Sequence, residues 1–153
     1  MVFLYQLYLN QTAGISLDPF SAWIAEQVRI LQNSLGYSTW LYHDGKQETT
    51  WFYVVSKYVT RMVEGCNAVS VMILFVAFIF AFYKGRKTFA FTAAGLVFLH
   101  VMNVLRIAAL NIVIYEHEEY GKMFHDYVFP AIIYGSVVLL WLIWIKKFAL
   151  KKP

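Results

Sequence analysis

The sequence predicts a multi-pass membrane protein that is mainly α-helical, with a small extracytoplasmic helix and an antiparallel sheet. The 153-residue chain is 60% hydrophobic and has a positive mean hydropathy, too apolar for an ordinary soluble domain. Three nearly uncharged runs, at 67–83, 88–105 and 127–145, have the length of membrane helices. Most Lys and Arg residues cluster in tracts beside these runs, which is typical of a topology signal and not of nucleic-acid binding.

Residues 1–10 are apolar but too few to cross a bilayer, because nine helical residues span only about 14 Å. No basic segment precedes them, as a signal peptide would require. We expect this segment to be the remnant of an N-terminal membrane helix, which gives four membrane helices in the intact protein. A short interfacial helix is the alternative.

Residues 11–65 are expected to form an extracytoplasmic unit of one helix and a small sheet. Asp18 and Pro19 are a helix start signal, with Asp as the cap and Pro at the first helical position. Apolar residues then recur at three- and four-residue spacing up to Gly36, which predicts an amphipathic helix on the bundle or on the membrane surface. The segments 37–42, 49–55 and 58–63 are rich in Tyr, Trp, Thr and Val, and they predict two or three antiparallel strands.

Residues 66–153 are expected to form the transmembrane catalytic bundle, with three complete membrane helices. The second run is 88–105, and the sequence also allows an extension to residue 115. The tract KGRK at 84–87 and the tail KKFALKKP are purely basic, which places both on the cytoplasmic side. All nine acidic residues lie outside these tracts, so the amphipathic helix and the sheet are expected on the outer side.

Three polar residues on separate runs are expected to reach the same outer level. Measured along ideal helices from the basic tracts, Cys66, Arg106 and His125 lie about 27, 28 and 31 Å away. Arg106 lies within an apolar stretch, where an ionisable side chain is costly and marks a functional candidate. His100, Asn103 and Arg106 follow each other at three-residue spacing, which predicts a polar stripe facing the bundle interior.

Each of these residues also has a plainer interpretation. Cys66, the only cysteine, could be a buried inert thiol. Arg106 could extend to the headgroups or pair with Glu64, and His125 could be an interfacial polar residue. His43 is expected in a turn, and His117 in a solvated turn or an adventitious metal site. No histidine pair has metal-ligand spacing together with a third ligand, so no metal or other cofactor is expected.

Together, Cys66, Arg106 and His125 predict nucleophilic catalysis. An adjacent imidazole and guanidinium would favour the thiolate of Cys66. His125 would return a proton to the leaving amine, and Arg106 would stabilise the thiolate or the oxyanion. The expected chemistry is acyl transfer on a peptide.

Cys66 in EGCNAVSV, Arg106 in NVLRIAAL and His125 in FHDYVFP match, in order and spacing, the Cys, Arg and His of the exosortase and archaeosortase family of membrane cysteine transpeptidases. The chain resembles this family from about residue 5, and the run YVTRMVEGCNAVSVMILF looks most like the short F-type exosortases. We expect Glu64, Asn67 and Asn103 to support the site.

The resemblance implies a multi-pass protein of the bacterial inner membrane with its active site on the extracytoplasmic side. The implied partners are the C-terminal sorting signal of an exported protein, the lipid bilayer and an unidentified amine-bearing surface acceptor. The signal would be cleaved through a thioacyl-enzyme and the protein passed to the acceptor. The alternative is a non-enzymatic membrane assembly or substrate-presenting subunit. A thiol redox or metal-handling protein is disfavoured, because one cysteine has no resolving partner.

Overall fold

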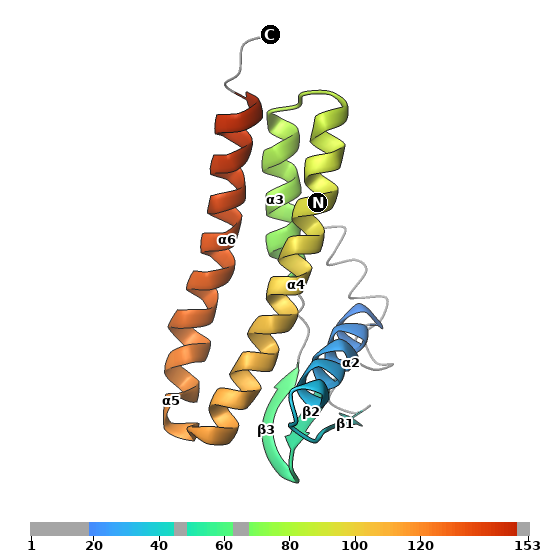
Figure 1. Cartoon of the computed structure of the whole chain (residues 1–153), viewed down its shortest axis with the longest axis vertical. Coiled ribbons are helices and arrows are strands. Elements are labelled where there is room, and N and C mark those ends of the chain that lie inside the picture. The colour runs from blue at the N-terminus through green and yellow to red at the C-terminus, as the bar shows by residue number, and fades with distance from the viewer. Residues whose placement is uncertain (1–18, 45–48, 63–67, 150–153) are drawn as a thin grey trace.

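The computed structural model describes residues 19–44, 49–62 and 68–149. Figure 1 shows the long helices running side by side, with a short helix and a sheet packed against one half of the longest. The elements, in chain order, are α2 (Pro19–Ser34), β1 (Thr39–Asp44), β2 (Thr49–Val54), β3 (Lys57–Met62), α3 (Val69–Ala81), α4 (Arg86–Glu116), α5 (Glu118–Met123), the π-helical turn η1 (Phe124–Val128), α6 (Phe129–Trp144) and the π-helical turn η2 (Ile145–Ala149). The expected N-terminal remnant at 1–10, and Cys66, Glu64 and Asn67, lie outside the described residues.

Helix α2 confirms the predicted amphipathic helix. It begins at Pro19, the position that the start signal indicated. After its last turn, Gly36 adopts a φ of 91°, a conformation that glycine tolerates best. The buried side of α2 packs on α4 and on the sheet in one apolar cluster, whose fully buried members include Ile24, Val28 and Phe52.

The predicted sheet has three strands in the order β1-β2-β3, and both pairs are antiparallel. In the second pair, Thr60 lies opposite Phe52 and Met62 lies opposite Thr50, with an irregularity between Phe52 and Tyr53. The expected turn role of His43 is wrong. This residue belongs to β1, and its Nδ1 lies 2.8 Å from the hydroxyl of Thr50 on β2.

Two helical stretches in the described residues are long and apolar enough to cross a membrane. These are α4 and the continuous stretch from Glu118 to Phe148. Only 39% and 22% of their most apolar windows are buried, whereas a core helix of a soluble protein would be mostly buried. The first predicted run, 67–83, contains a shorter helix. Helix α3 has 13 residues, which corresponds to a length of about 20 Å. Helix α4 covers the extension to residue 115.

The basic tracts beside the apolar runs lie together in the fold. The basic α3–α4 connection and the basic end of the last helix lie at one end of the molecule, whereas the sheet, α5 and the α4–α5 turn lie at the opposite end (Figure 1). The acidic residues Asp44, Glu116 and Glu118 belong to the second group of elements. The two basic tracts therefore lie at the end of the molecule opposite to these acidic residues.

A close contact holds α3 against α4. Gly95 on α4 faces the ring of Phe75 on α3, and a Cβ atom at Gly95 would lie 2.3 Å from Phe75 Cζ. Phe75 is fully buried in the cluster that also contains Leu99 and Trp144. Small residues at helix crossings allow such close approach, which matters where lipid provides no hydrophobic driving force.

Candidate functional site

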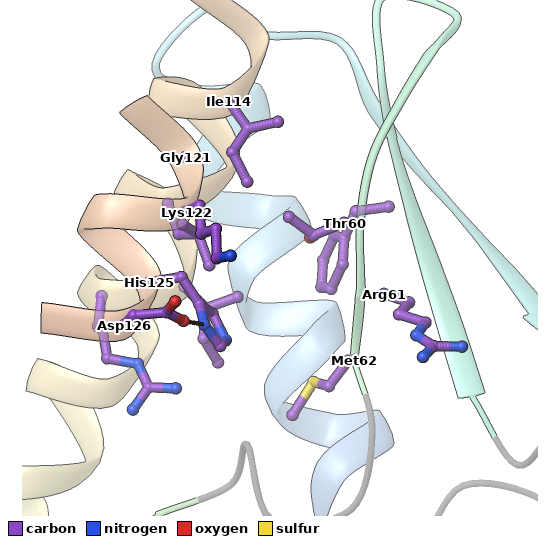
Figure 2. A pocket seen from close by; sticks show the side chains of 12 residues that line it. Thr60, Arg61, Met62, Ile114, Gly121, Lys122, His125 and Asp126 are labelled. Atoms are coloured by element: carbon purple, nitrogen blue, oxygen red, sulfur yellow. Dashed lines mark hydrogen bonds and ion pairs between the residues drawn. The ribbon is translucent and has the colours of Figure 1, made fainter. Parts of the chain in front are cut away.

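A cavity of about 300 Å³ lies where α4, the α5–η1 segment and the sheet meet (Figure 2). It is the place where the two predicted catalytic residues within the described part of the chain come together, because Arg106 and His125 both line it. The other lining residues are Phe52, Thr60, Arg61, Met62, Ile107, Leu110, Ile114, Gly121, Lys122 and Asp126.

Helix α4 provides one wall of the cavity. Arg106, Leu110 and Ile114 line it, and their four-residue spacing places them on one face of the helix. Arg106 is half-buried, and Leu110 is buried. The guanidinium therefore meets the cavity in largely apolar surroundings, where a charge interacts more strongly than it does in water.

The α5–η1 segment provides the wall that carries His125. Gly121 is buried one turn earlier, and a Cβ atom there would lie 2.5 Å from Ile114 Cγ1. Glycine at this position therefore lets α5 approach α4 closely. The Nδ1 atom of His125 lies 2.9 Å from Asp126 Oδ1, and the His125 side chain is 59% exposed. The imidazole is thus accessible at the cavity and is oriented by a neighbouring carboxylate.

Strand β3 provides the third wall. Figure 2 shows Thr60 and Met62 on the side of the strand that faces Lys122 and His125, whereas Arg61 points the other way. This follows from the alternation of side chains along a strand. Met62 is buried and is the last described residue before Cys66 in the sequence. The position of Cys66 itself lies outside the described residues.

The three residues of the predicted polar stripe of α4 have different surroundings in the structure. Asn103 is fully buried but is not among the residues that line the cavity. His100 faces α2, because its Nε2 lies 2.8 Å from Gln27 Oε1 and its ring stacks on Trp23 at 4.9 Å between centroids. Three-residue spacing advances by less than a full helical turn, so the direction drifts along the helix.

Several cavity residues were not predicted from the sequence as site residues. Asp126 is adjacent to His125 in the sequence, and that adjacency is the signal that could have identified it. Lys122 precedes His125 by three residues and therefore lies on the same helical face. Thr60 and Met62 gave no such signal, because their place at the cavity depends on how β3 docks on α4.

The charges around the cavity are mainly positive. The side chains of Arg106 and Lys122 line it, with Asp126 as the one lining carboxylate among the described residues, whereas the Arg61 side chain points away from it (Figure 2). At its edge, the ammonium of Lys57 on β3 lies 3.0 Å from Glu118 on α5 and connects two of the walls. No cluster of three His, Cys, Asp or Glu side chains in the described part of the chain could hold a metal ion.

This arrangement is suited to proton transfer to and from a bound group and to stabilisation of a negative charge on it. An accessible imidazole can exchange a proton, and a half-buried guanidinium can stabilise a developing negative charge beside it. No family model, curated protein or solved structure matches the chain.

Proposed function

We propose that this chain is a membrane-embedded cysteine peptidase and transpeptidase with Cys66 as nucleophile, His125 as general acid and base, and Arg106 as electrostatic stabiliser. The observation that supports it most is that Arg106 and His125, which belong to different helical segments, line one cavity. The cavity wall formed by β3 ends at Met62, and this strand precedes Cys66 in the sequence.

The short sequence distance between β3 and Cys66 would allow the thiol to reach the cavity. Cys66 lies four positions after Met62, and four steps of extended chain reach at most about 14 Å. A cavity of about 300 Å³ has the size of a small ligand pocket and could hold the few atoms around a scissile peptide bond. The proposal places the sulfur beside Arg106 and His125.

In the proposed reaction, the Cys66 thiolate attacks the carbonyl carbon of the peptide bond. Arg106 stabilises the negative charge on the tetrahedral oxyanion. The C–N bond then breaks, His125 gives a proton to the leaving amine, and a thioester remains on Cys66. An acceptor amine next attacks the thioester and loses a proton to His125, which releases the new amide and the free thiolate.

The proposed setting is the bacterial inner membrane, with the basic ends of the helices in the cytoplasm and the cavity on the outer side. Two membrane-length helices with mostly exposed apolar surface support this setting. The basic tracts at the α3–α4 connection and at the end of the last helix lie at the opposite end of the molecule from the sheet and α5 (Figure 1), which also supports it. The proposed substrate is the C-terminal sorting signal of an exported protein, and the proposed acceptor is an amine at the cell surface.

The test is processing of a co-expressed protein that carries such a signal, followed by immunoblotting. We expect Cys66→Ala and Cys66→Ser to abolish processing, and His125→Ala to reduce its rate by about 100-fold or more. Arg106→Gln should also reduce the rate strongly. The matched control for His125 is His117→Gln, because His117 is exposed in the α4–α5 turn and does not line the cavity.

Undiminished processing in both Cys66 variants would contradict the proposal. That result would favour the alternative of a non-enzymatic membrane assembly or substrate-presenting subunit, in which the thiol has no chemical role. Substitution of Cys66 separates the two functions because this residue is the only cysteine in the chain.

A further inference from the structure

A chain of polar side chains crosses the apolar interface behind the cavity. The hydroxyl of Thr60 donates to Asn111 Oδ1 at 2.5 Å, and the amide of Asn111 donates to Gln32 Oε1 at 3.3 Å. The amide of Gln32 in turn donates to the backbone carbonyl of Ala108 at 3.4 Å. The chain therefore connects β3, α4 and α2.

Both amide side chains of this relay are fully buried. Gln32 and Asn111 have no exposed surface, so each amide group that lost its partner would stay unpaired away from water. The relay gives each amide both a donated and an accepted hydrogen bond. The donor-to-acceptor direction of these hydrogen bonds is fixed, because the last acceptor is a backbone carbonyl, which cannot donate.

The relay lies directly behind two walls of the cavity. Thr60 is itself a lining residue of β3, and Asn111 follows the lining residue Leu110 on α4. Arg106 precedes Asn111 by five residues on the same helix. At the opposite end of β3, Lys57 pairs with Glu118 on α5. Strand β3 is thus connected to the helices by polar contacts near both of its ends.

We propose that Thr60, Asn111 and Gln32 are positioning residues, which fix the β3 wall of the cavity at a defined place against the α4 wall that carries Arg106. This inference rests on the proposed function, in which that relative placement sets the reactivity of the thiol. Apolar side chains would fill the same space, but they would allow the strand to slide. A directional relay specifies one arrangement.

The experiment uses the single cysteine of the chain as its reporter. The full-length protein is purified in detergent, and the rate of Cys66 alkylation by a small water-soluble maleimide is measured at about pH 7 and about pH 10, where most free thiols are ionised. The variants are Thr60→Val, Thr60→Ser, Arg106→Gln and His125→Ala. Thr49→Val is the matched control, because Thr49 is a buried sheet threonine whose hydroxyl has no partner among the described residues.

We expect Thr60→Val to lower the rate at about pH 7 by about three- to tenfold and to leave the rate at about pH 10 unchanged. Thr60→Ser retains the hydroxyl and should behave like the parent protein, as should Thr49→Val. Simple loosening of the structure would instead raise both rates, because the thiol would become more accessible. That pattern would overturn the inference.

The outcomes separate this inference from the proposed function. If Arg106→Gln and His125→Ala slow alkylation at about pH 7 and Thr60→Val does not, the relay has no positioning role and the proposed function stands. If neither Arg106→Gln nor His125→Ala changes the rate, the proposed function fails. Should Thr60→Val fail to fold, the triple variant Thr60→Val, Asn111→Leu, Gln32→Leu replaces the whole relay with apolar groups and leaves none of its amides unpaired.

Discussion

The Nδ1 atom of His125 lies 2.9 Å from Oδ1 of Asp126, the next residue in the chain. A carboxylate at this distance favours a proton on Nδ1, which leaves Nε2 of the neutral ring as the nitrogen that accepts a proton. The same hydrogen bond holds the ring in one orientation. Asp126 therefore has a defined role in the proposed mechanism, although it does not touch the reacting bond.

Replacing Asp126 with Asn should weaken the proposed activity modestly. The amide oxygen of Asn can still accept the hydrogen bond of His125, but a neutral amide is a weaker acceptor than a carboxylate. Because both side chains are partly exposed, we expect substrate processing to fall by less than about tenfold, against about 100-fold or more for His125→Ala. Equal losses in the two variants would show that the Asp126 charge matters as much as the imidazole.

Gly95→Ala should destabilise the bundle. The added methyl group would lie 2.3 Å from the ring of Phe75, which is fully buried and cannot move aside without disturbing its cluster. We expect a loss of about 1 to 3 kcal/mol in the free energy of unfolding, typical of overpacking. Thermal unfolding in detergent measures the change.

Gly135→Ala is the matched control for this substitution. Gly135 lies within α6, and a Cβ atom there would meet nothing within 4 Å. Alanine loses less backbone entropy than glycine on folding, so this variant should be more stable by about 0.5 to 1 kcal/mol. If both variants lost stability equally, the contact between Gly95 and Phe75 would not be the cause.

The ion pair between Glu26 and Arg29 should make the stability of the protein depend slightly on pH, with a loss at low pH. The hydrogen bond from Arg29 lowers the pKa of Glu26 from its ordinary value of 4.5. A carboxyl with a lowered pKa in the folded state stabilises that state above its unfolded pKa, and the contribution is lost as the pH falls through the folded value. The pair is partly exposed, so the effect is small and decreases with added salt.

The measurement is the melting temperature in detergent at about pH 7 and about pH 3, either side of the carboxyl pKa. The parent protein should lose slightly more stability on acidification than Glu26→Gln does. Arg29→Gln, which removes the partner, should show the same reduced dependence. An acid response identical in all three proteins would contradict the assignment.

Trp23→Ala should loosen α2 from α4. The indole stacks on His100 at 4.9 Å between ring centroids and 16° between planes, a contact worth about 0.5 to 1.5 kcal/mol. Hydrogen exchange of the α2 amides should become faster, while exchange in the sheet stays unchanged. Trp40→Ala is the control, because Trp40 stacks on Tyr53 within the sheet. It should leave α2 protected.

Local patterns in the sequence predicted most of the elements. The Asp18-Pro19 signal gave the first residue of α2, and the strand-forming segments gave all three strands to within about two residues. The prediction of β1 ended too early because His43 and Asp44 resemble turn residues. Both pair with β2, since Thr49 and Thr50 lie opposite them.

The long helices were harder to delimit. The acidic segment EHEEY suggested a solvated turn, but α5 already begins at Glu118 and continues through η1 into α6. Glu118 and Glu119 are favourable in the first turn of a helix, where the backbone dipole attracts negative charge. A hydropathy pattern alone could not reveal this, because it marks only the apolar part of the helix.

The candidate site was predicted in part. Counting residues from the basic tracts placed Arg106 and His125 at one level, and both line the same cavity. The same counting could not show that β3 forms a wall, because strand docking depends on contacts between residues far apart in the sequence. For the same reason, the relay of Thr60, Asn111 and Gln32 left no local signal.

The pairing of Thr60 with Phe52 also disfavours a misaligned sheet. If β3 slipped by one residue against β2, Arg61 would replace Thr60 or Met62 on the inner face, because successive side chains point to opposite sides. Its guanidinium would then meet Arg106 and Lys122, and like-charge repulsion would oppose the slipped form. Errors of alignment at this strand should therefore be corrected during folding.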